Sequence, residues 1–265
     1  MRRDGTEQSP WFQACESCGI VVAAYVLPAG KSLLLSLRNV YETLAVSAPT
    51  VVDAYRQRLT PETCNERLES WASRVVRNLE LVLTVRGREH IEPGRTYVIM
   101  SNHQSHYDVA VLYYVLGGNV RMVAKKELFD LPLFGRAIRD AGFVSVDRGN
   151  TESAIASLAG AKDHVAHGTH LWIAPEGTRS PTGELLPFKK GGFHIAMEMK
   201  TPILPITIRG TREALRAKGM RSRAGVEVDV DIHAPIDPAK YSDRDRRSAR
   251  DALMDEVRKA IASAL

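Results

Sequence analysis

Five short apolar runs, separated mostly by stretches long enough for helices, limit the folds open to this chain. The runs are Tyr97–Met100, Val120–Ala124, Phe143–Val146, His170–Ala174 and Ile203–Ile208. Buried strands of a parallel sheet appear in sequence as short continuous apolar segments, and parallel neighbours need long connections, usually helices, between them. The alternation therefore predicts an α/β domain with a mostly parallel sheet flanked by helices.

The segments on either side of these runs extend the predicted sheet and its helical layers. Thr60 and Pro61 form the pattern of an N-cap followed by proline at the first helical position, which predicts a helix over 61–78. Apolar residues then alternate over 79–85 and again over 226–232, which predicts two half-buried strands. The last predicted element is a C-terminal amphipathic helix whose apolar stripe comprises Leu253, Val257, Ile261 and Leu265.

The N-terminal segment has membrane character without a continuous span. Residues 17–37 are largely apolar, but Pro28, Gly30 and Lys31 interrupt them. A transmembrane helix needs about 20 consecutive apolar residues, and the acidic residues ahead of this stretch are not typical of a signal peptide. Two interpretations stay open at this point: a helical hairpin lying in the membrane interface, or apolar segments packed against the domain as ordinary core.

The positive charge of the chain is concentrated in one segment. Lysine and arginine number 36 against 31 aspartate and glutamate, a formal net charge of +5. Residues 176–223 alone hold 10 basic and 4 acidic side chains, which suits an acidic or phosphate-bearing partner. Nucleic acid is not expected, because this segment lacks interleaved aromatic residues. Three cysteines indicate a reducing compartment, and the CxxC of Cys15 and Cys18 has no second pair to complete a zinc site.

A histidine and an aspartate follow the first of the five predicted strands. His103 and Asp108 lie across a loop that leads into an apolar helix, so a tight turn could bring the carboxylate to the imidazole. A carboxylate on one ring nitrogen fixes the tautomer and leaves the other nitrogen free to take a proton from an alcohol. The pair therefore indicates general-base catalysis on a substrate hydroxyl.

Two other interpretations of the same residues stay open. Ser105 and Asp108 have the spacing of a capping box at a helix start, and Asp108 could fill this role and orient His103 at once. His103, His106 and Asp108 could instead ligate a metal ion.

Two further loops carry groups suited to a phosphate. The run Glu176-Gly177-Thr178-Arg179 follows the fourth predicted strand and offers close backbone approach, a hydroxyl and a planar guanidinium. Arg148 follows the third predicted strand. Because the carboxyl ends of parallel strands meet at one edge of a sheet, we expect both arginines to lie near His103.

Four sequence blocks, taken together, resemble those of the lysophosphatidic acid acyltransferases, the 1-acylglycerol-3-phosphate O-acyltransferase family of phospholipid biosynthesis. They are NHQSHYD at 102–108, GFVSVDR at 142–148, PEGTRS at 175–180 and TPILPI at 201–206, in the family's order. The first is the family's H-x-x-x-x-D signature. Two positions depart from the family pattern: Ala174 stands where a large apolar residue is usual, and Thr201 where valine is common.

The resemblance implies a fold and roles for individual residues. The fold would be a glycerolphosphate acyltransferase-like α/β domain over 61–265, preceded by an N-terminal helical membrane-interface element within 1–60. His103 would be the general base and Asp108 its orienting partner. The acceptor-binding residues would be Arg148, Glu176, Gly177, Thr178 and Arg179, with Lys125 near the acceptor phosphate.

The resemblance also implies the reaction. A fatty acyl group would pass from acyl-CoA or acyl carrier protein to the free hydroxyl of 1-acylglycerol 3-phosphate, giving phosphatidic acid, with no cofactor and no metal. The chain would act at the cytoplasmic face of a membrane, as a peripheral or monotopic transferase. Two alternatives remain: another acceptor, such as glycerol 3-phosphate or a different lysolipid, and a non-catalytic module that binds anionic lipid.

Overall fold

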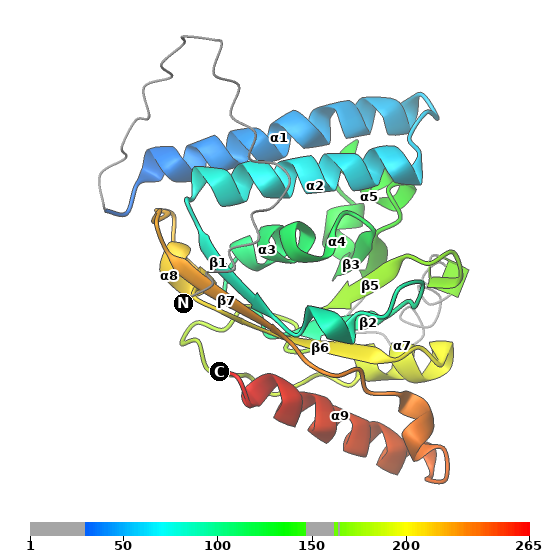
Figure 1. Ribbon diagram of the computed structural model, residues 1–265. Helices are drawn as coiled ribbons and strands as arrows, with labels where there is room; N and C mark the ends of the chain where they lie inside the picture. Colours follow the sequence, from blue (N-terminus) through cyan, green and yellow to red (C-terminus); the bar gives the residue numbers. More distant parts are fainter. Residues whose placement is uncertain (1–29, 147–161, 164) are drawn as a thin grey trace, which may run out of the picture.

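A seven-stranded mixed sheet forms the centre of the molecule (Figure 1). The computed structural model describes residues 30–146, 162, 163 and 165–265, and all structural statements below concern these residues. The strand order is β1-β7-β6-β2-β5-β3-β4. The strands are β1 (Val82–Arg86), β2 (Val98–Ser101), β3 (Val120–Lys125), β4 (Val144–Val146), β5 (His170–Ile173), β6 (Ile203–Arg209) and β7 (Glu227–Ile232).

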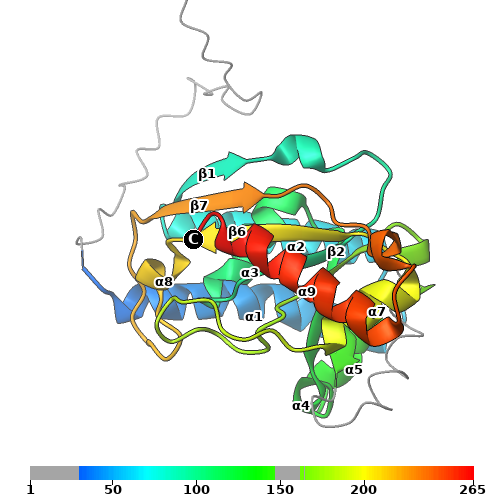
Figure 2. The ribbon, with the colours of Figure 1, turned by 90° about the horizontal axis from the view of Figure 1, so that it is seen from below.

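Helices cover both faces of this sheet. On one side α3 (Tyr107–Leu116) lies beneath α2 (Pro61–Asn78), and α1 (Leu33–Tyr55) lies outermost, packed on α2 and α5 (Phe134–Asp140). Figure 2 shows α7 (Gly191–Met199) and α9 (Arg246–Ala262) on the opposite face. Short helices complete the chain: η1 (Arg88–His90), α4 (Lys126–Phe129), α8 (Thr211–Ala214) and η2 (Pro238–Tyr241).

The alternation of side chains along β2 shows how one strand serves two cores. Ile99 packs with α2 and α3, whereas Val98 and Met100 pack with α7 and α9. All three side chains are buried, which explains why the strand appears in sequence as a continuous apolar run.

The predicted elements are largely confirmed, with differences at their ends. Helix α2 spans the predicted 61–78, and Thr60 caps it by accepting the backbone N–H of Thr63. Strand β1 begins at Val82 rather than at Leu79, because Leu79 is the buried C-cap of α2. The stripe of α9 is confirmed at its three buried residues, but Leu265 was wrongly included: it lies beyond the helix end and is 45% exposed.

The sheet is mostly parallel, as predicted, but the last strand along the chain introduces one antiparallel pairing. β7 pairs antiparallel with β6 and parallel with β1, so β1 and β7 run against the other five strands. The other five strands, β6, β2, β5, β3 and β4, are all parallel to one another. They carry the apolar runs from which the fold was predicted.

Helix α1 buries little of its apolar surface. Its only buried residues are Leu35, Asn39 and Ala54. Eight large apolar side chains of this helix are exposed: Leu33, Leu34, Leu37, Val40, Tyr41, Leu44, Val52 and Tyr55. None of the helices in the described part of the chain is both long and apolar enough to cross a bilayer.

Candidate active site

The candidate site lies where the central parallel strands end. The loop after β2 carries His103, the loop after β5 carries Glu176 to Arg179, and Thr211 follows the end of β6. Because these strands are neighbours and parallel, their carboxyl ends bring the three segments to one edge of the sheet, called here the active-site edge.

The carboxylate of Asp108 is buried and fully engaged at this edge. Its Oδ2 atom lies 2.7 Å from Nδ1 of His103 and accepts the backbone N–H groups of Gln104 at 2.7 Å and Ser105 at 2.9 Å. The hydroxyl of Thr211 donates to the other oxygen, Oδ1. With no exposed surface, the carboxylate is held in one position by four donors from two loops.

The two roles weighed for Asp108 are present together. The backbone N–H of Tyr107 donates to Oγ of Ser105 at 3.2 Å, while Asp108 receives the N–H of Ser105. This reciprocal arrangement closes the start of α3 and holds the carboxylate against His103. The His103 side chain is 17% exposed and packs edge-on against Trp172 at a centroid distance of 5.8 Å.

Glu176 joins the loop after β5 to the loop after β2. Its Oε1 accepts the backbone N–H of His103 at 2.8 Å, and its Oε2 accepts that of Leu186 at 2.9 Å. The N–H of Ser180 donates in turn to the carbonyl of His103 at 2.7 Å. Both oxygens of this buried carboxylate therefore contact backbone groups of the chain itself. Burial raises the pKa of Glu176, and the two N–H donors oppose that shift.

The remaining residues of that loop, Gly177, Thr178 and Arg179, differ in their exposure. Gly177 has φ of +71°, and a Cβ there would meet Cδ of Lys189 at 2.9 Å, so the lysine stem packs directly over the glycine. Thr178 is exposed and Arg179 half-exposed. No carboxylate lies within ion-pair distance of Arg179 among the described residues, which leaves its guanidinium available for a ligand.

Of the two other residues predicted to bind the phosphate, Lys125 is described by the structure and Arg148 is not. Lys125 ends β3 and is exposed at the strand's carboxyl end, two strands along the sheet from β2. Arg148 lies outside the described residues, as do Cys15 and Cys18.

His106 adds a second imidazole beside the pair. Burial disfavours the charged form of His106, and the positive charge of Arg179 adds to this effect. The pKa of His106 is therefore lowered. The N–H of Ser180, the next residue after Arg179, donates to the carbonyl of His103 at 2.7 Å, which brings this part of the loop to the His103 loop. In the described part of the chain, no three histidine, cysteine, aspartate or glutamate side chains are grouped to hold a metal ion.

Thr211 was missed by the sequence reasoning. Gly210, with φ of +92°, lies so close to the carbonyl of Glu227 that any Cβ would collide with it. The turn that this glycine permits places Thr211 against Asp108, although 103 residues separate the two. The available signal was its position: Gly210 and Thr211 follow a predicted parallel strand, as the other site loops do.

Comparison with known proteins decides the family. Residues 82–209 match the family model named Acyltransferase. A 1-acyl-sn-glycerol-3-phosphate acyltransferase from Chlamydomonas reinhardtii is 32% identical over 238 residues, which cover 88% of this chain and 67% of that protein. The chain belongs to the 1-acylglycerol-3-phosphate acyltransferase family. The resemblance inferred from the four sequence blocks is thereby confirmed.

Other members of this family agree in sequence and in fold. The human 1-acyl-sn-glycerol-3-phosphate acyltransferase alpha is 35% identical over 153 residues, 57% of this chain and 54% of that protein. The crystal structure of a 1-acyl-sn-glycerophosphate (LPA) acyltransferase from Thermotoga maritima superposes with a TM-score of 0.70 at 26% identity. That match covers 88% of this chain and 95% of the other. The chain spans between about half and three-fifths of the length of the mammalian relatives it matches.

Proposed function

We propose that this chain transfers a fatty acyl group from an acyl-CoA or acyl carrier protein thioester to the free hydroxyl of 1-acylglycerol 3-phosphate, giving phosphatidic acid. The observation that carries the proposal is the 2.7 Å contact between Nδ1 of His103 and Oδ2 of Asp108 at the active-site edge. Family membership and the activities for which the relatives are named support the same reaction.

The geometry supports a direct transfer with His103 as the general base. When Nδ1 donates its proton to Asp108, Nε2 is left to take the proton of the acceptor hydroxyl. The oxygen attacks the thioester carbonyl, the carbon–sulfur bond breaks, and the imidazolium returns the proton to the departing thiolate. Asp108 holds the ring and stabilises its charged form. Base catalysis of this kind contributes about 10²- to 10⁴-fold.

Arg179 is the proposed ligand of the acceptor phosphate. A guanidinium binds phosphate through paired N–H groups, and this one lies near the His103 loop without a carboxylate partner among the described residues. Thr178 and Lys125 would add further donors, whereas the backbone N–H of Gly177 already donates to the carbonyl of Ala174 at 3.0 Å. Arg148 stays a prediction from the family resemblance.

Glu176 is proposed as a positioning residue for the same site. Its carboxylate oxygens already bind backbone N–H groups of His103 and Leu186, so its effect on the acceptor would pass through the two loops that it joins.

The outward face of α1 is proposed to lie in the membrane interface. Exposed leucines such as Leu34 and Leu37 would gain free energy by leaving water, and a lysolipid acceptor resides at that interface. The chain would bind peripherally or monotopically at the cytoplasmic face, where acyl-CoA and acyl carrier protein are found.

The test uses purified chain in mixed micelles with a labelled acyl thioester and a panel of lysolipids and glycerol 3-phosphate. Thiol release and acylated product are followed together for wild type, His103→Ala and the control His167→Ala, whose histidine is 76% exposed. Phosphatidic acid from wild type and the control, but not from His103→Ala, is expected. Thiol release without acylated lipid would contradict acyl transfer, preference for another lysolipid would contradict the acceptor, and no reaction at all would favour a binding module.

A further inference from the structure

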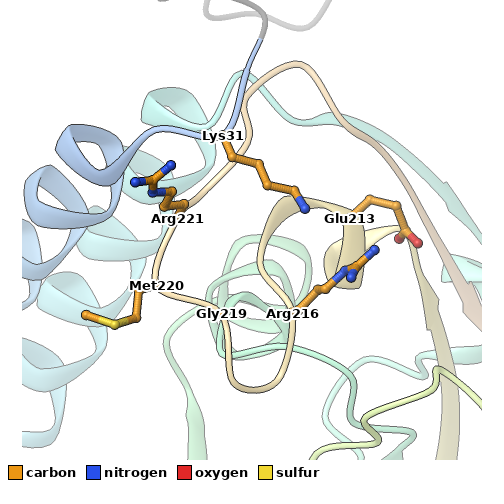
Figure 3. A pocket seen from close by; sticks show the side chains of 6 residues that line it. All are labelled: Lys31, Glu213, Arg216, Gly219, Met220 and Arg221. Carbon is orange, nitrogen blue, oxygen red and sulfur yellow. The ribbon is translucent and has the colours of Figure 1, made fainter.

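A cavity of about 300 Å³ lies beside the active-site edge (Figure 3). It is lined by Lys31, Glu213, Arg216, Gly219, Met220 and Arg221. Helix α8 connects it to the site, since Thr211 at the start of that helix bonds to Asp108 and Arg216 follows its end. The volume is at the lower end of the range for ligand pockets, about 300–1,000 Å³. We call it the basic cavity.

The basic cavity has more cations than carboxylates. Lys31, Arg216 and Arg221 have no carboxylate within ion-pair distance in the described part of the chain, whereas Glu213 lies 4.0 Å from Arg212. Figure 3 shows Lys31 reaching from the start of α1 toward Arg216 across the opening. In the same view Arg221 extends toward α1, away from Lys31 and Arg216. Unpaired positive charges on the rim of one concavity attract an anion, and arginine suits a phosphate in particular.

The backbone around the basic cavity is held by hydrogen bonds. Ser32 and Ser222 exchange backbone N–H groups and carbonyls at 2.7 and 3.1 Å, so the neighbouring Lys31 and Arg221 sit on two joined segments. The Ser222 hydroxyl also bonds to the hydroxyls of Ser36 and Tyr107. Tyr107 directly precedes Asp108 in the sequence. The backbone segments that carry Lys31 and Arg221 are therefore held together before a ligand arrives, which lowers the entropic cost of binding.

Apolar side chains border the basic cavity. Met220, which lines the cavity, is 75% exposed, and Leu34, three residues after Lys31 in the sequence, is 74% exposed. This combination suits a phosphate that carries apolar chains better than a phosphate free in solution. At a membrane surface, the cations would meet the headgroup layer while the leucines and the methionine enter the acyl boundary.

We infer that the basic cavity binds the phosphate group of an anionic phospholipid at the membrane surface, and so orients the active-site edge toward the bilayer. This inference rests on the proposed membrane docking of α1 and adds a selectivity for anionic lipid. The site is separate from the acceptor groups on the loop after β5.

The experiment compares binding of the full chain to sedimenting vesicles of phosphatidylcholine alone and of phosphatidylcholine mixed with phosphatidylglycerol. The test variant is Arg216→Gln combined with Arg221→Gln. The control, Arg247→Gln combined with Lys259→Gln, removes the same charge from exposed positions of α9, across the sheet from α1. Basic residues at an anionic surface contribute on the order of fivefold each in affinity, so the test variant should lose roughly tenfold or more on the mixed vesicles and the control much less.

Three results would overturn the inference. They are equal losses in the test and control variants, an equal loss on vesicles of phosphatidylcholine alone, and binding of inorganic phosphate without membranes that depends on Arg216 and Arg221. The third would assign the cavity to a free anion. The His103→Ala variant should bind the mixed vesicles like wild type, and acyl transfer is not needed for the measurement, so failure of the proposed reaction would be seen separately.

Discussion

The active-site edge and the outward face of α1 differ in how their side chains are satisfied. At the active-site edge, both oxygens of Asp108 and of Glu176 are bound by donors from within the chain, and both carboxylates are buried. On α1 and beside it, large apolar side chains and unpaired cations remain exposed. The buried carboxylates of the first region are satisfied within the chain, whereas the exposed groups of the second region are not.

This difference teaches how the two kinds of surface should be interpreted. Buried polar groups that are fully hydrogen-bonded hold one geometry, as a general base requires. Exposed apolar side chains gathered on one helix indicate an interaction surface, because scattered ones are normal but contiguous ones are not. The two regions should therefore respond to substitution in different measurements.

The largest effect should come from breaking the active-site edge at its centre. Asp108→Asn keeps the size of the side chain but replaces the carboxylate with a neutral amide. His103 therefore loses the negative charge that orients its ring. The rate of acyl transfer should fall by about 10³-fold. Steady-state kinetics on micellar substrate would measure it, with unfolding followed in parallel. A rate within threefold of wild type would mean that the pair is structural.

The next largest effect should appear on α1. Leu34→Gln combined with Leu37→Gln removes apolar surface proposed to enter the interface. Both leucines are already partly covered, so at about half of the 1.5–3 kcal/mol for full burial of each, the pair is worth about 1.5–3 kcal/mol. Affinity for phosphatidylcholine vesicles should fall about 10- to 100-fold. The unfolding free energy should change little, because both side chains are exposed.

The control for this prediction is Val82→Gln combined with Leu265→Gln, two exposed apolar residues that are not part of α1. Flotation of the vesicles measures binding in both variants. An equal loss in the control would mean that general surface hydrophobicity, rather than α1, accounts for membrane binding.

A smaller effect should come from the donor that the sequence reasoning missed. Thr211→Val leaves Oδ1 of Asp108 without the threonine hydroxyl, which costs about 1–3 kcal/mol for a buried acceptor. We expect kcat to fall about tenfold with little change in the acceptor KM, and Thr211→Ser to restore it. A change in KM alone, or no rescue by serine, would mean that Thr211 does not position Asp108 and His103.

The smallest effect is a pH dependence of stability at Glu176. Because burial raises its pKa, the folded chain binds more protons there than the unfolded chain between the two pKa values. Wild-type stability relative to Glu176→Gln should be greatest below the usual glutamate pKa of 4.5 and decrease as pH rises through the raised pKa. Urea unfolding at several pH values tests this, and a difference that increases with pH would contradict it.

The sequence by itself determined the parts that local patterns encode. Apolar runs located the parallel strands, Thr60 and Pro61 located the start of α2, and the loop from His103 to Asp108 indicated that these two side chains pair. Each of these depends on residues a few positions apart, where helix and strand periodicity and turn geometry act directly.

Only the tertiary structure decided the relations between distant segments. The connection between β6 and β7 is long enough for either direction, so local pattern could not show that β7 runs antiparallel. The contact of Thr211 with Asp108 likewise depends on strand order, and the exposure of α1 depends on what packs against it. Burial and long-range hydrogen bonds are properties of the assembled chain, because each requires a partner that local sequence does not name.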